Sequence, residues 1–291
     1  MRKWIEAMRL RTLPVSIAGV LAGCGCAVWQ NGFSFVPALL CLLFALSAQI
    51  ASNFGNEYYD FKNGVDRKGR EGFRRGVTEG DISPQMMKYA TFLMLGIAAI
   101  IGCLLLIYGP LWLVLVGCII LLFALAYSAG PYPLSHHGLG DIAVVIFFGV
   151  VPVTFTCYLQ TGGWTQLPML FTTSAAIGLL AANVLIVNNY RDKEDDEAVG
   201  KNTTVVIFGR KTMSLVYLLS GILAMAIMSP LWLQLPLWAL FAPLVYILLH
   251  VLTWHSMSSR RGAALNPFLG RTARNLLIFT LMLLAVLVCG R

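Results

Sequence analysis

The chain has 291 residues, of which 58% are hydrophobic and only 12% carry a charge. Soluble proteins carry roughly 25% charged residues, so this chain lacks the polar side chains needed to cover a water-facing surface. Its net charge is +8. This composition excludes an ordinary soluble domain and favours a protein that lies in a membrane.

Apolar runs recur along the chain at about the length of ~20 residues that a membrane-spanning helix requires. Each run is expected to be helical, because in lipid every backbone polar group must be satisfied within the protein. The expected spans are 13–29, 35–54, 86–107, 111–130, 139–159, 167–190, 213–228, 231–253 and 272–290. The pattern predicts an all-α, polytopic membrane protein of about nine helices, forming a single domain over residues 1–291.

Basic residues gather between the spans. They occupy 1–12, 55–88, 191–211 and 254–274, and Arg291 completes the set. With nine alternating spans these segments share one side, which the positive-inside rule identifies as cytoplasmic. The net charge is thereby explained without a nucleic-acid partner. We therefore expect a protein of the bacterial cytoplasmic (inner) membrane, with an active site that faces the cytoplasm in loops 55–85 and 191–212.

The stretch ASNFGNEYYDFKNGVDRKGREG, residues 51–72, places oxygen-bearing side chains at the end of an apolar run. Asn53 and Glu57 are four residues apart, as are Asn56 and Asp60, and Asp66 follows. Residues three or four apart share one face of a helix. The spacing therefore predicts that several oxygens are directed to one point.

A second stretch, ANVLIVNNYRDKEDDEAVGKNT at residues 182–203, repeats this arrangement at the end of another span. Asn188, Asp192 and Asp196 follow one another at intervals of four residues. Such a cluster is also typical of a solvated, charged loop, and we favour that interpretation for Glu194, Asp195 and Glu197. For Asp60, Asp192 and Asp196 a functional role is favoured, because ionisable groups at membrane depth are costly.

Two clusters of oxygen ligands suit Mg²⁺, which binds through one or two carboxylates together with substrate phosphate oxygens. Nearby basic and amide side chains would hold the phosphate through charge-assisted hydrogen bonds. The expected metal ligands are Asn56, Glu57, Asp60, Asp192 and Asp196. The expected phosphate-binding residues are Arg70, Arg75, Lys201, Asn53 and Asn188, although Asn53 equally suits an interhelical hydrogen bond.

These two motifs resemble the aspartate-rich motifs of the UbiA superfamily of intramembrane prenyltransferases. Within it, the chain is similar to the branch that prenylates 1,4-dihydroxy-2-naphthoate in menaquinone biosynthesis. The similarity covers about residues 9–211 and rests on LRTLPVSIAGVLAG, NEYYDFKNGVD, YSAGPYPLSHHGLGDIAVVIFFG and NNYRDKEDDEAVGKNTTVVIFGRK. Two departures stand out: Glu57 replaces the usual Asp, and Phe73 follows Gly72 where this branch commonly has Pro.

The resemblance implies a helical bundle around a central cavity and a Mg²⁺-dependent transferase. This enzyme would move a polyprenyl group from polyprenyl diphosphate to 1,4-dihydroxy-2-naphthoate, with decarboxylation, to give demethylmenaquinol. Asp66, in preference to Asp141, would orient or deprotonate a ring hydroxyl, and Tyr127 would donate a hydrogen bond to the diphosphate. Helix capping is an equal account of Asp141, and a place in the interfacial aromatic belt is an equal account of Tyr127.

Two other functions would account for part of this pattern. A prenyltransferase that acts on a different aromatic acceptor, such as 4-hydroxybenzoate, would carry the same metal motifs. A transporter would place ionisable residues near the bilayer midplane, and the centres of the expected spans lack them. Of the histidines, His136 and His137 are expected to be solvated loop residues rather than a metal pair, and His250 is expected to lie at the interface.

Overall fold

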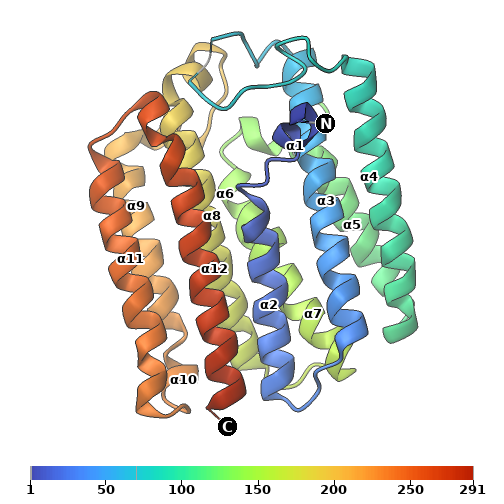
Figure 1. Ribbon diagram of the computed structural model, residues 1–291, viewed down its shortest axis with the longest axis vertical. Helices are drawn as coiled ribbons and strands as arrows, with labels where there is room; N and C mark the ends of the chain where they lie inside the picture. The colour runs from blue at the N-terminus through green and yellow to red at the C-terminus, as the bar shows by residue number, and fades with distance from the viewer. Residues whose placement is uncertain (1, 70, 291) are drawn as a thin grey trace.

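Long helices that run side by side make up the protein (Figure 1). The structure is a computed structural model that describes residues 2–69 and 71–290. Its helices are α1 (Arg2–Ala7), α2 (Leu13–Trp29), α3 (Phe35–Lys62), α4 (Pro84–Leu105), α5 (Leu113–Ala126), α6 (Gly140–Val144), α7 (Val151–Thr161), α8 (Leu167–Ala198), α9 (Thr204–Ile227), α10 (Ser229–Trp232), α11 (Phe241–Ser258) and α12 (Asn266–Cys289). No strand occurs in the described part of the chain, where one isolated bridge pairs His137 with Asn202.

The predicted all-α membrane class is confirmed. Within residues 2–69 and 71–290, seven helical stretches are long and apolar enough to cross a membrane: Phe35–Lys62, Pro84–Tyr108, Gly140–Thr161, Leu167–Ala198, Thr204–Ile227, Leu237–Ser258 and Gly262–Cys289. The first and fourth expected spans correspond to shorter apolar helices, α2 and α5. Each of the nine expected ranges therefore falls on an apolar helix, but only seven reach spanning length.

Two helices extend beyond the ends that hydropathy predicts. The spans expected to end at residues 54 and 190 continue as helix to Lys62 in α3 and to Ala198 in α8. Hydropathy marks where a chain leaves lipid, whereas the backbone remains helical for two further turns. These extra turns carry both aspartate motifs.

Burial separates central from peripheral helices. In α8, 72% of the most apolar window is buried, against 17% in α4. In Figure 1, α4 accordingly lies at the outer edge of the bundle, while α8 lies behind α12. The second motif therefore sits on the central helix of the protein.

The segment between α6 and α7 packs directly against α8. Residues Val145–Val150 form a π-helical turn, a feature often found at functional sites. A Cβ atom at Gly149 would lie 2.6 Å from the carbonyl oxygen of Ser174, and one at Gly178 would lie 2.6 Å from that of Val145. Small residues let the two backbones touch, and this contact fixes the start of α6 relative to α8.

The expectation for His250 was wrong, because α11 begins at Phe241 and places His250 in mid-helix. His250 is 1% exposed. Its Nε2 atom lies 3.0 Å from the carbonyl oxygen of Tyr217, and its ring stacks between those of Tyr217 and Tyr246. Gly221 makes room, since a Cβ atom there would overlap the imidazole.

The connections that border the two motifs gather at one end of the bundle, at the top in Figure 1. They are the N-terminal segment and residues 63–83, 127–139, 199–203 and 259–265. We call this the motif end, because α3 and α8 both finish there. Four loops and two helix tips thus surround the candidate site.

Candidate active site

The first motif forms a hydrogen-bonded cluster on the last turns of α3. Asn56 Nδ2 donates to Asp60 Oδ2 at 2.9 Å, as the four-residue spacing predicted, and to Ser128 Oγ at 2.9 Å. Asn56 Oδ1 accepts a hydrogen bond from the Arg9 guanidinium. Asn56 and Asp60 are both buried, so the motif is an organised site rather than a solvated loop.

Arg9 was not predicted as a site residue, yet it is held firmly at the motif. Its φ of +53° lies in the left-handed region, which non-glycine residues rarely occupy and which often marks functional positions. Asn53 Nδ2 donates to the Met8 carbonyl oxygen at 3.0 Å, and Gln49 Nε2 donates to that of Thr12 at 2.9 Å. The structure therefore uses the Asn53 amide to fasten the loop that carries Arg9.

His136 also belongs to this cluster, and the expectation of a solvated loop histidine was wrong. Its Nε2 atom lies 3.6 Å from Asp60 Oδ1, and its side chain is only 16% exposed. The loop folds back over α3 because Ser135 N–H donates to the Tyr127 carbonyl oxygen and Asn202 N–H donates to that of His136. His137 instead stacks on Tyr132 with ring centroids 3.5 Å apart.

The second motif pairs its acids with basic side chains. The Arg191 guanidinium donates to both carboxylate oxygens of Asp192, at 2.6 and 2.7 Å, and to Asn188 Oδ1 at 2.9 Å. Lys201 Nζ lies 3.5 Å from Asp196 Oδ1. Asp192 and Asp196 are buried, so this motif is also removed from bulk water.

The two motifs meet around Lys201 and Tyr127. The charge of Lys201 acts on the Asp60 carboxylate as well as on Asp196. Tyr127, just beyond the end of α5, is close enough to Asp60 and Asp196 to be affected by both charges. Burial, followed by the charge of Asp141, raises the pKa of the Tyr127 phenol well above its usual value, so this group remains a hydrogen-bond donor.

Glu57, Asp66 and Arg75 fasten the loop after α3. Glu57 Oε1 accepts a hydrogen bond from Val77 N–H at 3.0 Å, and Arg75 Nε lies 3.4 Å from Asp66 Oδ2. Glu57 and Asp66 are buried. The structure thus places Glu57 beside the first motif with one oxygen already used to hold the loop.

Asp141 lies in the first turn of α6, where helix capping was one of its two expected roles. Its Oδ2 atom accepts a hydrogen bond from Thr204 Oγ1, and its Oδ1 atom is buried without a hydrogen-bond partner among the described residues. Its charge acts on Tyr127, so Asp141 borders the site. Arg70, which was expected to bind phosphate, lies outside the described residues.

The oxygen atoms of the two motifs are of the kind that Mg²⁺ binds. Among residues 2–69 and 71–290, no three His, Cys, Asp or Glu side chains are grouped closely enough to hold an ion by themselves. Asp60 Oδ1 is nevertheless a buried carboxylate oxygen that accepts no hydrogen bond from the described residues, with His136 Nε2 3.6 Å away. Asn56 carries a further amide oxygen, which Arg9 binds. Such oxygens fit a cation that takes one or two carboxylates and completes its shell with water and phosphate.

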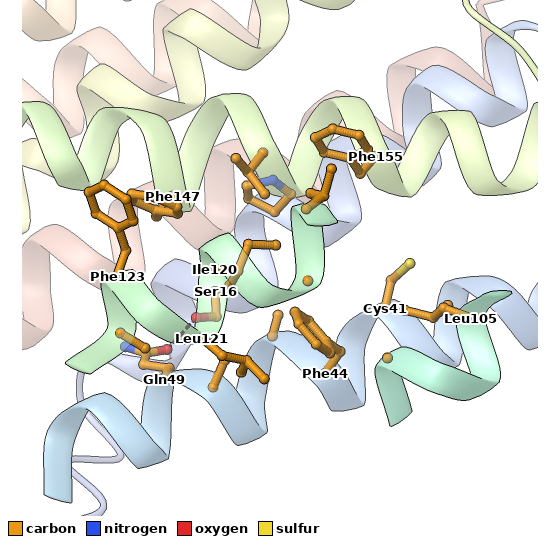
Figure 2. A pocket seen from close by; sticks show the side chains of 18 of the residues that line it. Ser16, Cys41, Phe44, Gln49, Leu105, Ile120, Leu121, Phe123, Phe147 and Phe155 are labelled. Carbon is orange, nitrogen blue, oxygen red and sulfur yellow. Dashed lines mark hydrogen bonds between the residues drawn. The ribbon is translucent and has the colours of Figure 1, made fainter. Parts of the chain in front are cut away.

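An apolar cavity of about 260 Å³, with Tyr127 among its lining residues, lies inside the bundle (Figure 2). Figure 2 shows Phe44, Phe147 and Phe155 around it, and Ser16 hydrogen-bonded to Gln49. Cys103 of α4 and Cys118 of α5 line the same cavity, and both are exposed. The site therefore combines a charged end with an apolar chamber.

The sequence of this chain is similar to those of known proteins. Residues 16–277 match the model of the UbiA prenyltransferase family. A 1,4-dihydroxy-2-naphthoate octaprenyltransferase of Escherichia coli (strain K12) is 34% identical over 96% of this chain and 92% of its own length. An enzyme of the same name from Mycobacterium tuberculosis is 32% identical over 99% of this chain and 98% of its own.

Solved structures show the same fold. A UbiA homologue from Archaeoglobus fulgidus, bound to DMAPP and Mg²⁺, superposes with a TM-score of 0.69 at 17% identity, covering 98% of this chain and 99% of that one. An apo UbiA homologue from Aeropyrum pernix K1 gives 0.70 at 15% identity, covering 99% and 98%. The sequence matches and the shared fold agree with the resemblance that the two motifs indicated. The chain belongs to the UbiA prenyltransferase family.

Proposed function

We propose that this protein transfers a polyprenyl group from polyprenyl diphosphate to 1,4-dihydroxy-2-naphthoate, with loss of CO₂. One observation carries the proposal: the two acidic motifs lie close to Lys201 and Tyr127, and Tyr127 also lines an apolar cavity. A charged head and a long apolar tail on one substrate require such a junction. The relatives named as naphthoate octaprenyltransferases support this choice of acceptor.

The residues of both motifs fit a Mg²⁺ site. Asn56, Asp60, Asp192 and Asp196 would hold the ion, with Glu57 a further candidate whose remaining oxygen is available to it. Bound there, Mg²⁺ would neutralise the diphosphate and make it a better leaving group. Phosphate oxygens from the substrate would complete the ligand set.

Basic side chains beside the acids would hold the diphosphate. Lys201 lies beside Asp196 of the second motif, and Arg9 binds Asn56 of the first, while Arg75 and Asn188 flank them. Charge-assisted hydrogen bonds from these groups are stronger than neutral ones. Arg70 keeps its predicted role as a further phosphate ligand, and the part of Asn53 is to hold Arg9 in place.

The first chemical step breaks the bond between the allylic carbon and the diphosphate oxygen, and the electron pair leaves with the diphosphate. Tyr127 would donate a hydrogen bond to the departing group. The tail occupies the apolar cavity, where aromatic rings such as Phe147 stabilise the allylic cation through cation–π attraction. Exclusion of water protects the cation from hydrolysis.

The naphthoate ring then attacks the allylic carbon through its carboxylate-bearing carbon. Loss of CO₂ returns the electron pair of the broken bond to the ring and restores its aromaticity. Asp66 or Asp141 would orient a ring hydroxyl or accept its proton. Asp141 is the better placed, since its charge acts on Tyr127, whereas Asp66 is paired with Arg75.

The positive-inside rule places the motif end at the cytoplasmic face of a bacterial inner membrane. Water-borne acceptor then arrives from the cytoplasm and the prenyl chain arrives from lipid. A reporter fused after Cys289 would test this orientation. Signal from the periplasmic side is expected, because α12 ends opposite the motif end (Figure 1).

The decisive assay uses purified protein in nanodiscs with Mg²⁺, a polyprenyl diphosphate, and either carboxyl-labelled 1,4-dihydroxy-2-naphthoate or 4-hydroxybenzoate. Release of labelled CO₂ with formation of a prenylated naphthol is expected from the first acceptor only. Turnover of 4-hydroxybenzoate alone would contradict the choice of acceptor. Absence of prenyl transfer to either would contradict the proposal as a whole.

A further inference from the structure

A second cavity, of about 840 Å³, opens at the motif end above the first motif. The N-terminal segment and the loop after α3 form its walls. Its lining includes the basic residues Arg2, Lys3, Arg9, Arg11, Arg74, Arg75 and Arg191, and the acids Glu6, Glu57 and Asp81. The excess of positive charge favours anions and concentrates them there.

Most of these cations already have an acidic partner. Arg2 lies 3.1 Å from Glu6, Arg74 lies 2.7 Å from Asp81, and Arg75 lies 3.4 Å from Asp66. Such pairs reduce the charge that is left for a ligand. The remaining attraction must come from cations that are not neutralised in this way.

Arg11 is different. Within the described ranges its side chain makes no hydrogen bond and no ion pair, and its guanidinium lies 4.0 Å from the centre of the Phe73 ring. The Arg191 guanidinium lies on the same ring at 5.1 Å. Phe73 therefore lies between an unneutralised arginine and the arginine that binds Asp192.

The cavity reaches both motifs. Glu57 of the first motif and Asn188 of the second line its floor together with Arg9. A ligand in this cavity is thus adjacent to the site proposed for the diphosphate. It approaches from the side opposite the apolar chamber, which begins at Tyr127 and extends into the bundle.

We propose that this cavity binds the acceptor as a planar aromatic carboxylate, with its carboxylate on Arg11 and its ring beside Phe73. This inference rests on the proposed function. A guanidinium fork matches a carboxylate with two parallel hydrogen bonds, and the phenyl ring supplies an apolar wall for a flat ligand. Drug-sized ligands occupy cavities of about 300–1,000 Å³, so a bicyclic acid fits with room for water.

The geometry also separates the two substrates. The prenyl tail is apolar and enters the chamber lined by Phe44 and Phe147, whereas the acceptor is anionic and enters the basic cavity. Each substrate therefore has a compartment that matches its own chemistry. The reacting carbons would meet between the two compartments, near the first motif, whose Glu57 lines the basic cavity.

Binding can be measured apart from turnover with two fluorescent probes, 2-naphthoate and 2-naphthol, which differ in the carboxylate. Arg11→Gln should weaken 2-naphthoate binding about tenfold and leave 2-naphthol binding unchanged, because only the charge-assisted pair is lost. Phe73→Leu should weaken the binding of both probes, whereas Phe73→Tyr should bind both about as tightly as the wild type. Retained binding of 2-naphthol shows that the Arg11→Gln protein is folded.

Arg260 provides a matched control. It is also an exposed arginine at the motif end, and its guanidinium lies 4.7 Å from the Phe268 ring, but it does not line the cavity. Arg260→Gln should leave the binding of both probes unchanged. An equal loss in both variants would mean that any surface arginine serves, which would overturn the proposal.

Kinetics separate this inference from the proposed function. Arg11→Gln should raise KM for the acceptor about tenfold, with kcat and KM for the prenyl diphosphate within about twofold of wild type. A rise in KM for the prenyl diphosphate alone would assign the cavity to the diphosphate and overturn the inference, while the enzyme would still be a naphthoate prenyltransferase. Probe binding that depends on Arg11 in a protein without naphthoate turnover would instead refute the proposed function.

Discussion

His136 Nε2 lies 3.6 Å from Asp60 Oδ1, although 76 residues separate the two in the chain. The same histidine accepts a hydrogen bond from Asn202 through its backbone carbonyl oxygen. One short loop thus contacts the first motif with its side chain and the segment after the second motif with its backbone. This loop holds the two halves of the site in register.

We expect His136→Ala to reduce kcat by about 10- to 100-fold, because a 1 Å misplacement of a catalytic group has a cost of this order. His136→Asn, which keeps a hydrogen-bonding group, should recover part of the loss. His137→Ala is the matched control, since that ring stacks on Tyr132 away from Asp60. Equal effects of the two alanine substitutions would show that the loop matters only as a whole.

Asp60→Ala and Asp192→Ala should each abolish turnover, since each removes a proposed Mg²⁺ ligand from the site. Prenyl transfer is measured with purified protein, and folding is checked by the elution profile in detergent. Glu197→Gln is the control, because Glu197 forms an exposed pair with Lys193 on the far side of the motif. Near-normal rates in both alanine variants would refute the metal site.

Arg9→Gln should raise KM for the prenyl diphosphate about tenfold, because one charge-assisted hydrogen bond is lost. Asn53→Ala should have a smaller effect in the same direction, since Asn53 acts by holding the loop that carries Arg9. In the double variant the Asn53 effect should disappear. Additive effects would show that Asn53 contributes independently of Arg9.

Removal of divalent cations should stop the reaction. Excess EDTA is expected to abolish prenyl transfer, and added Mg²⁺ is expected to restore it, because the diphosphate would otherwise leave as an unneutralised anion. The measurement is the rate before and after metal is returned to the same sample. Unchanged catalysis in excess EDTA would contradict the role of the two motifs.

Gly149→Ala should destabilise the protein by about 1–3 kcal/mol, the usual cost of overpacking a tight contact. A Cβ atom there would lie 2.6 Å from the Ser174 carbonyl oxygen, with backbone on both sides. Thermal unfolding in detergent measures the effect. Gly96→Ala is the control, because a Cβ atom at Gly96 meets nothing within 4 Å, and an equal loss of stability there would rule out this explanation.

Local patterns predicted much of this molecule. Hydropathy located every apolar helix, since lipid requires long apolar segments, and four-residue spacing predicted the contact between Asn56 and Asp60. The helices of both motifs end later than hydropathy suggested, because polar residues can extend a helix beyond the lipid. His250 was misplaced for a related reason: the end of its helix was expected at residue 253, five residues before its observed end at Ser258.

The contacts of Arg9, Ser128 and His136 could not be predicted in this way. Each joins α3 across 47 to 76 residues of chain, and no periodic pattern records which loop folds over which helix. The φ of +53° at Arg9 likewise could not be predicted from the sequence, because a non-glycine residue gives no signal of a left-handed backbone. What the sequence did provide was the quoted similarity around LRTLP and LSHHGLGD, the stretches that border these residues.

The wall of the apolar chamber has a consequence for which isoprenoids the enzyme accepts. A chamber of about 260 Å³ encloses only the first units of a long chain, and α5, which has no buried residue, forms part of its side. Cys103 and Cys118 line the chamber and are both exposed, so we expect the carbons beyond the first units to leave the chamber on the side of α4 and α5. Polyprenyl diphosphates that differ only in those outer units should therefore be accepted at similar rates.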